Sequence, residues 1–202
     1  MPDDYWNHNV HYHPMVLDAV PDACGEAVDI GCGDGLLARK LAGRARHVTG
    51  VDRSAEMISL AREHSAHTGN VSFVEADFLN DPEGRLPEGK YDFVSAVAVV
   101  HHMSFEAAVT GLTRLLAPAG RLVIVGLAGN RTPLDWIISG AGLPASRIQA
   151  LRHGGKGNPP GMPVEDPDMS WGEVRRAARH LLPGCRFRRH LLWRYSIVWE
   201  RP

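Results

Sequence analysis

The chain has little cysteine and no long apolar run. Its 3 cysteines, Cys24, Cys32 and Cys185, have a spacing that matches neither a disulfide framework nor a metal-binding pair. No stretch of about eighteen apolar residues occurs, so a transmembrane helix is not expected. The run Met1-Pro2-Asp3-Asp4 is acidic, unlike the basic start of a secretory signal. These absences favour a cytoplasmic protein that does not enter a membrane.

Excess charge of either sign is also absent, because the net charge is −1. Acidic residues outnumber basic ones two to one in residues 1–100, and the ratio reverses in residues 101–202. A group of arginines near the end of the basic half could bind an anion or nucleic acid: Arg175, Arg176, Arg179, Arg186, Arg188 and Arg189. No aromatic residues alternate with them for base stacking, and charge commonly protects exposed edge strands. We therefore expect a solvated surface and no nucleic-acid partner.

Apolar periodicity predicts one α/β domain in which strands and helices alternate. Helices are expected at 9–19, 35–43, 55–67, 104–116, about 132–151 and 171–181. Strands are expected at 27–30, 47–51, 71–75, 92–96, 121–126, 186–191 and 195–199. This alternation favours a parallel sheet with helices on both faces. Ligands of such sheets bind at the carboxyl ends of the strands, where the strand order reverses.

A glycine-rich turn follows the first predicted strand. The run Val28-Asp29-Ile30-Gly31-Cys32-Gly33-Asp34-Gly35 is an apolar strand that breaks into glycines and opens a helix. Glycine allows a sharp turn and the close approach of a ligand, and a helix start offers free N–H groups. Asp52 lies about twenty residues later, at the tip of the next strand, where a carboxylate can accept both ribose hydroxyls. The pattern predicts a nucleotide-type site.

The glycine spacing decides which cofactor fits. The dinucleotide pattern G-x-G-x-x-G requires its third glycine where this chain has Leu36. The arrangement acid-x-Gly-x-Gly-x-Gly, formed by Asp29, Gly31, Gly33 and Gly35, instead resembles motif I of the class I S-adenosylmethionine (SAM) dependent methyltransferases. In that family the glycine loop passes beside the methionine part of the cofactor. An NAD(P)-dependent oxidoreductase is the alternative, and the position of Leu36 disfavours it.

Later segments resemble the same family in the same order. Residues 71–78 resemble the third strand and its end, 91–96 the fourth strand, and 115–125 the helix end, turn and fifth strand. The resemblance is close over 26–128 and looser beyond, where 185–199 resembles a closing antiparallel pair of strands. It implies a Rossmann-like, doubly wound α/β fold: a mostly parallel seven-stranded sheet with a C-terminal antiparallel strand pair. Residues 1–202 would form this single domain.

The resemblance implies SAM as the cofactor. Asp77 would accept a hydrogen bond from the adenine amine, Phe78 would supply a backbone N–H, and Asp52 would hold the ribose. The complete set of expected cofactor-binding residues is Asp29, Gly31, Cys32, Gly33, Gly35, Asp52, Arg53, Met57, Asp77, Phe78, Ala96 and Val97. Cys32 is expected to be a small loop residue without a redox role.

An N-terminal cap, residues 1–25, precedes the run that resembles motif I of the family. It is dense in aromatic and imidazole groups between 5 and 14. In the resembled family such a segment often folds over the cofactor. The alternative is a plain helix that packs Trp6, Val10 and Tyr12 against the core. Histidines 8, 11 and 13 have a spacing that could converge on a metal ion. No metal is expected, because no cysteine or carboxylate accompanies them.

A lid insertion, residues 127–170, is the second segment outside the core pattern. Apolar residues within 132–151 predict a broken amphipathic helix. The glycine- and proline-rich run 154–163 is not expected to form regular structure. Connections of this length are commonly functional lids. The insertion could therefore wall an acceptor pocket, and a simple surface connection is the alternative.

The expected reaction is methyl transfer to an oxygen or nitrogen atom of a small molecule, with carbon also open. The protein must align the acceptor, exclude water and, for an oxygen acceptor, remove a proton. His102 and His101, on the turn after the fourth strand, and His11, His13 and Tyr12 of the cap are the candidate catalytic residues. Each histidine could be a base or only a wall of the pocket. A domain of the same fold that binds without catalysing transfer is a further alternative, and either a monomer or a homodimer is expected.

Overall fold

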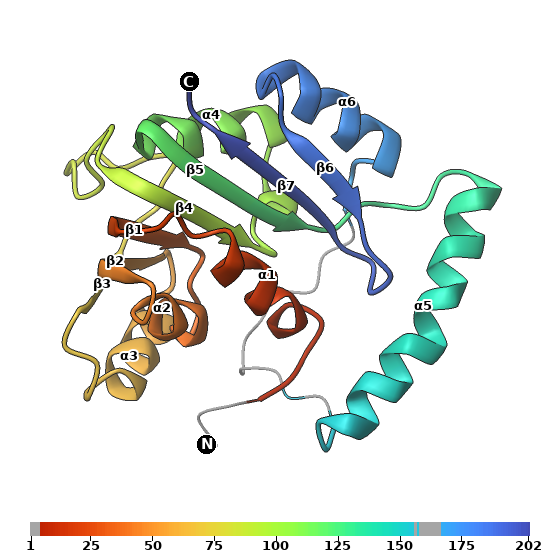
Figure 1. The fold of residues 1–202 in the computed structure, drawn as a ribbon, viewed down its shortest axis with the longest axis horizontal. Coiled ribbons are helices and arrows are strands. Elements are labelled where there is room, and N and C mark those ends of the chain that lie inside the picture. Colours follow the sequence, from red (N-terminus) through yellow and green to blue (C-terminus); the bar gives the residue numbers. More distant parts are fainter. Residues whose placement is uncertain (1–4, 156, 158–166) are drawn as a thin grey trace.

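The computed structural model describes residues 5–155, 157 and 167–202, without the side chain of Ala141. Seven strands form one sheet in the order β3-β2-β1-β4-β5-β7-β6 (Figure 1). The strands are β1 (Cys24–Ile30), β2 (Ala45–Asp52), β3 (Val71–Glu75), β4 (Tyr91–Val97), β5 (Leu116–Gly126), β6 (Arg186–Arg189) and β7 (Tyr195–Glu200). All seven predicted strands are present; several are longer than expected, and β6 ends at Arg189 instead of at 191.

The sheet is parallel except at β7. Strands β3, β2, β1, β4 and β5 pair in parallel, whereas β7 is antiparallel to both β5 and β6. The order reverses at β1, which lies between β2 and β4, so the loops after β1 and β4 diverge there. A doubly wound sheet binds its ligand at such a point. The predicted fold class, including the antiparallel pair at the end of the chain, is confirmed.

Helices cover both faces of the sheet (Figure 1). They are η1 (Val10–Tyr12), α1 (His13–Asp18), α2 (Leu36–Leu41), α3 (Ala55–His64), η2 (Val100–His102), α4 (Phe105–Leu115), α5 (Pro133–Arg152) and α6 (Trp171–Leu181). One buried apolar cluster joins α4 and α6 to the sheet, and a second joins α1, α2 and α3 to the opposite face. Alternating strand residues such as Val94 and Phe93 enter opposite clusters, as the two-residue period of a strand requires.

Helix α5 corrects one expectation about the insertion. The predicted broken helix is a single helix of 20 residues, although Pro144 lies inside it. Proline removes one backbone donor, but the helix is held at its start by a capping box between Thr132 and Asp135. Its last turn is held by a stack of His153 on Trp6, with ring centroids 5.4 Å apart. The glycine- and proline-rich run 154–163 lies mostly outside the described residues.

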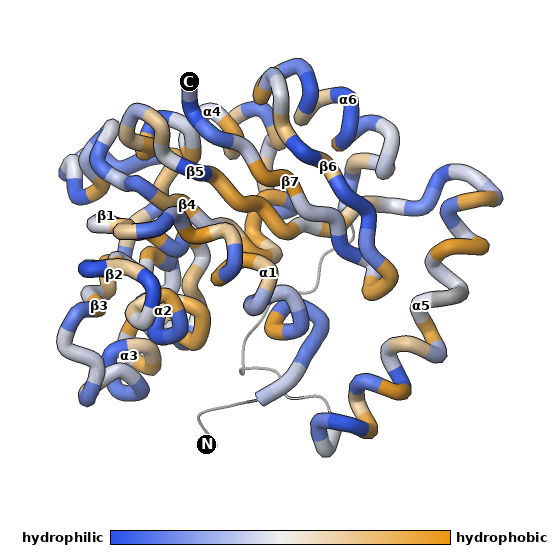
Figure 2. The backbone as a smooth tube through the Cα atoms, viewed as in Figure 1, coloured by the Kyte–Doolittle hydropathy of each residue, from blue (hydrophilic) through white to orange (hydrophobic). Residues whose placement is uncertain are grey.

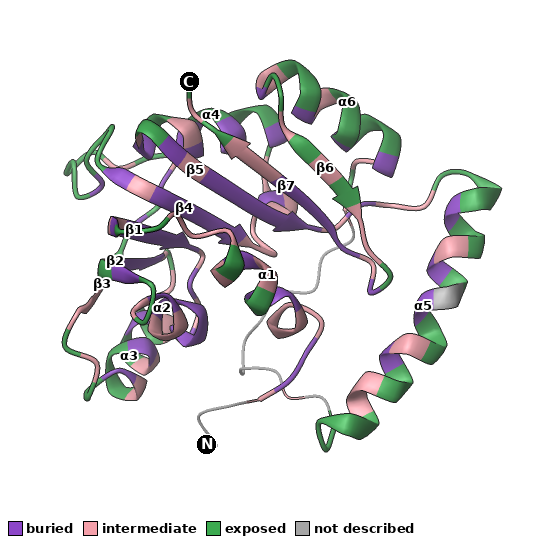
Figure 3. Ribbon diagram, viewed as in Figure 1, coloured by how far each residue is buried: buried purple, intermediate pink, exposed green. Residues whose placement is uncertain are grey.

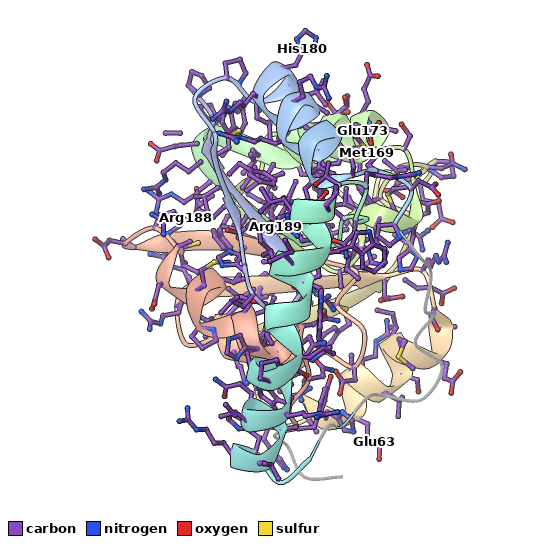
Figure 4. The ribbon with its side chains drawn as sticks, turned by 90° about the vertical axis from the view of Figure 1, so that its right-hand side faces the viewer. Glu63, Met169, Glu173, His180, Arg188 and Arg189 are labelled. Carbon is purple, nitrogen blue, oxygen red and sulfur yellow. The ribbon has the colours of Figure 1, made fainter. Side chains whose placement is uncertain are left out.

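The arginine group is solvated apart from one member. Arg189 forms an ion pair with Asp135 of α5, and its guanidinium lies 4.0 Å from the ring centroid of Trp171. Figure 4 shows Arg189 beside α5, whereas Arg188 points away from it. The expectation of free solvation is therefore wrong for Arg189, because it fastens the insertion to the sheet edge. In the described part of the chain, no helix is both long and apolar enough to cross a lipid bilayer.

Candidate active site

Three glycines shape the loop between β1 and α2. Gly31, Gly33 and Gly35 have φ angles of +69°, +53° and +79°, which residues with a Cβ rarely adopt. A Cβ at Gly31 would overlap the side chain of Val99, and one at Gly35 would meet the ring of Phe73. Gly33 instead has open space where a Cβ would lie. The loop is thus packed at both ends and leaves bare backbone at its centre, as close approach of a ligand requires.

Asp52, the last residue of β2, holds the loop. Its Oδ2 accepts a hydrogen bond from the backbone N of Gly33 at 3.0 Å, and its Oδ1 accepts one from the N of Ser54 at 2.9 Å. Each carboxylate oxygen can accept two hydrogen bonds, so both retain capacity for a ligand. The structure brings the expected ribose acceptor next to the glycine loop.

Asp29 places a buried carboxyl group beneath the loop. Its side chain is 2% exposed, and its Oδ1 accepts a hydrogen bond from the hydroxyl of Ser95 at 2.7 Å. Burial raises the pKa of Asp29 to about 7, and the Ser95 bond opposes this while the Asp52 carboxylate adds to it. The cause is desolvation, which disfavours the ionised form.

Asp34, inside the glycine loop, connects the loop to the N-terminal cap. The hydroxyl of Tyr5 donates a hydrogen bond to Oδ1 of Asp34 at 3.2 Å, and Nδ1 of His64 lies 3.8 Å from Oδ2. Burial, together with the Asp34 carboxylate, raises the pKa of Tyr5 well above its usual value. The phenol therefore stays protonated and donates, so the cap and the loop form one hydrogen-bonded unit.

The cap and the loop together enclose a pocket at the carboxyl end of β1. Its described lining residues are Tyr5, Asn7, Asn9, Val10, His13, Asp29, Gly31, Cys32, Gly33, Asp34, Leu36, Leu37, Met57 and Val97. Two of them are carboxylic acids, and none of these described residues is Lys or Arg. The Coulomb interaction therefore favours a cationic ligand over a pyrophosphate. Glycine backbone, acidic lining and the nearby Asp52 fit a sulfonium nucleoside such as SAM.

Cys32 lines this pocket as a thiol. It is buried, and burial followed by the carboxylates of Asp29 and Asp52 raises its pKa far above the usual thiol range. A reactive cysteine needs the thiolate form. The side chain of Cys32 therefore acts as a small apolar wall.

The three candidate catalytic residues of the cap lie in different environments in the structure. His13 is buried and lines the pocket. Tyr12 packs in the core instead, and its hydroxyl accepts a hydrogen bond from the N of Leu192 at 3.3 Å. The ring of His11 packs edge-on against those of Tyr12 and Trp6. Burial, with a smaller effect of His153, lowers the pKa of His11. Of the three, only His13 is among the described residues that face the pocket.

His101 and His102 lie on η2, directly after β4. Their ring centroids are 3.9 Å apart with an interplanar angle of 38°, and both side chains are half-buried. The turn before them packs on the glycine loop, since Val99 fills the space beside Gly31. Ala98 in this turn has a φ of +57°, a strained value for a residue with a Cβ. The histidine pair thus borders the β4 side of the loop, outside the described pocket lining.

The remaining expected cofactor residues lie beyond the pocket. Asp77 is exposed after β3, and its Oδ1 accepts a hydrogen bond from the N of Leu79 at 3.0 Å. Phe78 is buried in the core, Arg53 is exposed and Ala96 is buried within β4. These positions follow the edge of the sheet from β2 to β4, where an adenosine group could extend out of the pocket.

Sequence patterns missed several pocket residues. Tyr5, Asn7, Asn9 and Val10 belong to the cap that was singled out, but none was expected individually to face the loop. Asp34 was also missed, although a carboxylate between two loop glycines is a visible signal. The described residues contain no group of three or more His, Cys, Asp or Glu arranged to hold a metal ion. His8 instead bonds Ser146 Oγ through Nε2 at 2.8 Å.

Comparison with known proteins agrees with this geometry. The family described as "Methyltransferase domain" matches residues 27–120. An uncharacterized methyltransferase of Mycobacterium tuberculosis is 31% identical over 207 residues, which cover 99% of each chain. A ubiquinone biosynthesis O-methyltransferase of Sodalis glossinidius is 29% identical over 64% of this chain and 53% of its own.

A solved structure shows the same fold. The N-methyltransferase NodS of Bradyrhizobium japonicum, solved with S-adenosyl-L-homocysteine, superposes with a TM-score of 0.61 at 16% identity, covering 97% of this chain and 89% of its own. The oxidoreductase alternative has no support among these relatives. Because the Mycobacterium relative matches along nearly its whole length and the sheet order and glycine loop agree, this chain belongs to the class I SAM-dependent methyltransferases.

Proposed function

We propose that this enzyme transfers the methyl group of SAM to an oxygen or nitrogen atom of a small molecule. The observation that carries the proposal is the pocket formed by the glycine loop and the cap. A cofactor on the loop would have its reacting end beneath cap residues, including His13 and Asn9.

The loop and its neighbours would hold the cofactor. Gly31, Gly33 and Gly35 would pass beside its amino-acid part, with Asp34 supplying a carboxylate and Asp29 a buried carboxyl group beneath the loop. Asp52 would accept hydrogen bonds from the ribose, and Asp77 would accept one from the adenine amine near Phe78. The remaining proposed contacts are the walls formed by Cys32, Arg53, Met57, Ala96 and Val97.

SAM, when bound, supplies a methyl group on a positively charged sulfur, which is already electrophilic. The residues of the chain must hold the acceptor atom in line with that group. The cap segment from Tyr5 to His13 would exclude water, because it covers the loop. For an oxygen acceptor, His102 or His101 would remove the proton, with His13 as the candidate from the cap. A neutral nitrogen acceptor needs no strong base.

One named relative supports oxygen as the acceptor atom. It is called a ubiquinone biosynthesis O-methyltransferase and matches 64% of this chain and 53% of its own length. The name of this relative supports methyl transfer to oxygen, but it does not identify the acceptor molecule of this chain. The acceptor is therefore proposed as a small molecule with an ionisable oxygen or a neutral amine.

Calorimetry with SAM and, separately, NADH tests the proposal. We expect SAM to bind and NADH not to bind, and incubation of enzyme and SAM with phenols, acids or amines to release S-adenosylhomocysteine. Asp52→Ala should weaken SAM binding about tenfold to a hundredfold, the range for hydrogen bonds to a charged group. Asp92→Ala is the matched control, because Asp92 accepts bonds from the N atoms of Gly25 and Glu26 at the other end of β1.

Two results would contradict the proposal. Unchanged SAM affinity in a folded Asp52→Ala protein would remove the ribose assignment. SAM binding without release of S-adenosylhomocysteine, with every acceptor class and with SAM alone, would favour a binding domain over a transferase.

A further inference from the structure

Helix α5 presents its apolar side to the outside of the protein. Leu134, Ile137, Ile148 and Leu151 are between 50% and 83% exposed, and Trp136 on the same helix is 66% exposed. Figure 2 shows hydrophobic residues along α5 at the edge of the molecule, and Figure 3 shows many of its residues as exposed. Contiguous apolar patches of this kind mark interaction sites.

The inner side of α5 is polar and small, and it is bonded to the body of the protein. Asp135 pairs with Arg189. The Ser139 hydroxyl donates a hydrogen bond to Oδ1 of Asn130 at 2.8 Å, and Ser146 contacts His8. A surface helix ordinarily buries its apolar stripe and exposes its polar one. Since the polar side of α5 has its own hydrogen-bond and ion-pair partners, the helix cannot rotate about its axis to bury its apolar side without breaking those contacts.

The outward residues have the spacing of a helix-pairing seam. They lie three, four or seven residues apart, as in a coiled coil: Leu134, Ile137, Pro144, Ile148 and Leu151. The order of the large residues is also the same from either end, with leucine outermost and isoleucine next. Two antiparallel copies with an axis between 142 and 143 would place Leu134 against Leu151 and Ile137 against Ile148. A twofold interface requires such self-complementarity.

The charges on α5 permit this pairing. Arg147 and Arg152 are exposed. In the antiparallel register Arg147 lies level with Ile138 of the second copy, and Arg152 lies level with Pro133. Like charges therefore do not face each other. Positive charge beside apolar residues also suits an anionic lipid surface, but a lipid surface does not explain the symmetric order of the seam.

The exposed apolar area of the seam fits a small dimer interface. The helix is about 30 Å long at 1.5 Å per residue. The four large apolar side chains of the seam, Leu134, Ile137, Ile148 and Leu151, are at least half exposed. At on the order of 100 Å² each, they would contribute about 400 Å² per chain. A standard interface buries about 800 Å² per partner, so this pairing is expected to give a weak, concentration-dependent dimer.

We propose that α5 is a homodimer interface, in which two copies of the enzyme pair this helix antiparallel across a twofold axis. Leu134 packs against Leu151 and Ile137 against Ile148 of the second copy. Ser146 on the inner side of the same helix contacts His8 of the cap, and His153, directly after the helix, stacks on Trp6. The dimer therefore also braces the segment that covers the pocket.

Sedimentation equilibrium of the whole chain tests the proposal. The native protein should be a dimer, and Ile137→Lys combined with Ile148→Lys should raise its dissociation constant on the order of hundredfold or more, because central apolar contacts dominate interface energy. The matched control is Thr110→Lys, since Thr110 is exposed on α4. Both variants change solvent-exposed positions, so circular dichroism and the melting temperature of the monomer should show that each folds.

Disulfide trapping tests the register. In a Cys185→Ser background, Ile137→Cys chains and Ile148→Cys chains should cross-link when mixed, and neither should cross-link efficiently by itself. The two positions in one helix are about 16 Å apart, too far for an internal disulfide, so a bond between them identifies a second copy.

Three results would overturn the proposal. A native chain that is monomeric at all concentrations excludes it. A monomer that cosediments with phosphatidylglycerol vesicles through Ile137 and Ile148 assigns the surface to lipid. A dimer that survives the double lysine variant, or Ile137→Cys chains that cross-link efficiently alone, places the contact elsewhere or in another register.

Discussion

The guanidinium of Arg194 donates two hydrogen bonds to Oδ1 of Asn9, from Nε at 2.9 Å and from Nη2 at 2.7 Å. Arg194 is 8% exposed, and burial lowers the pKa of its side chain to about 10. In the described residues Arg194 forms no ion pair with a carboxylate, so an amide oxygen is its charge-stabilising partner. Because Asn9 lines the pocket, this contact ties the start of β7 to the cap.

Asn9→Ala should therefore destabilise the protein and weaken SAM binding. Leaving a buried charged donor without its acceptor costs about 1–3 kcal/mol or more. Asn9→Asp is the informative counterpart, because it keeps the geometry and supplies a carboxylate. We expect Asn9→Asp to melt at or above the native temperature at neutral pH. Its advantage should disappear as the pH falls and that carboxylate becomes protonated. Equal melting temperatures for native and Asn9→Ala would show that Arg194 does not depend on the cap.

Tyr5 and Tyr12 separate the binding and packing roles of the cap. Tyr5→Phe removes the hydrogen bond to Asp34 and should raise the dissociation constant of SAM about tenfold, since a bond to a charged group contributes about 1.5–3 kcal/mol in a buried site. Tyr12→Phe removes only the bond from the N of Leu192 and should lower stability by about 1 kcal/mol. Calorimetry and urea unfolding measure the two effects. A reversed pattern would mean that the cap contacts the cofactor through Tyr12.

The strands of the sheet could be predicted from the sequence, whereas the contacts that hold the cap over the glycine loop could not. Apolar alternation and the glycines at 31, 33 and 35 identify strands and a turn locally, so their positions follow from short stretches of sequence. Asn9 and Arg194 are 185 residues apart, and nothing in either neighbourhood indicates the partner. A polar contact across such a separation has no periodic signal. The cap was expected to be either a lid or a packed helix. In the structure Trp6 and Tyr12 are buried, whereas Tyr5 and Asn9 line the pocket.

Helix α5 shows a different reason for failure. Its apolar residues predicted a broken amphipathic helix, without saying which side faces inward, and burial is the usual use of an apolar stripe. The stripe is exposed because Asp135, Ser139 and Ser146 hold the opposite side. The amino-acid pattern determines that the helix is amphipathic, but the partners of both sides determine which side faces inward.

Asp29→Asn should change how stability depends on pH. The pKa of Asp29 is about 7 in the folded protein against 3.8 for the free group, so the folded state binds more protons between these values. The contribution of Asp29 to stability is therefore present below about pH 4 and is lost as the pH rises toward 7, by at most about 1.4 kcal/mol per pH unit. Asparagine does not titrate and can still accept the Ser95 hydrogen bond.

Urea unfolding of both proteins at several pH values measures this effect. The free energy of unfolding of Asp29→Asn, relative to native, should increase as the pH rises from 4 to 7 and stay constant above 7. If the free energies of unfolding of the two proteins change in parallel from pH 4 to 7, then Asp29 is already ionised in the folded enzyme throughout this range. The pKa shift assigned to its burial would then be wrong.

His102→Ala and His13→Ala decide which histidine, if either, removes a proton from an oxygen acceptor. A positioned base contributes about 10²–10⁴-fold to the rate, so we expect His102→Ala to lose that factor in kcat, together with the fall in rate at low pH, while SAM still binds. His13→Ala should mainly raise the KM of the acceptor, because His13 lines the pocket. A raised KM with kcat preserved in His102→Ala would make His102 a wall residue. Loss of the low-pH fall in His13→Ala instead would assign the base to the cap, which would then both exclude water and accept the proton.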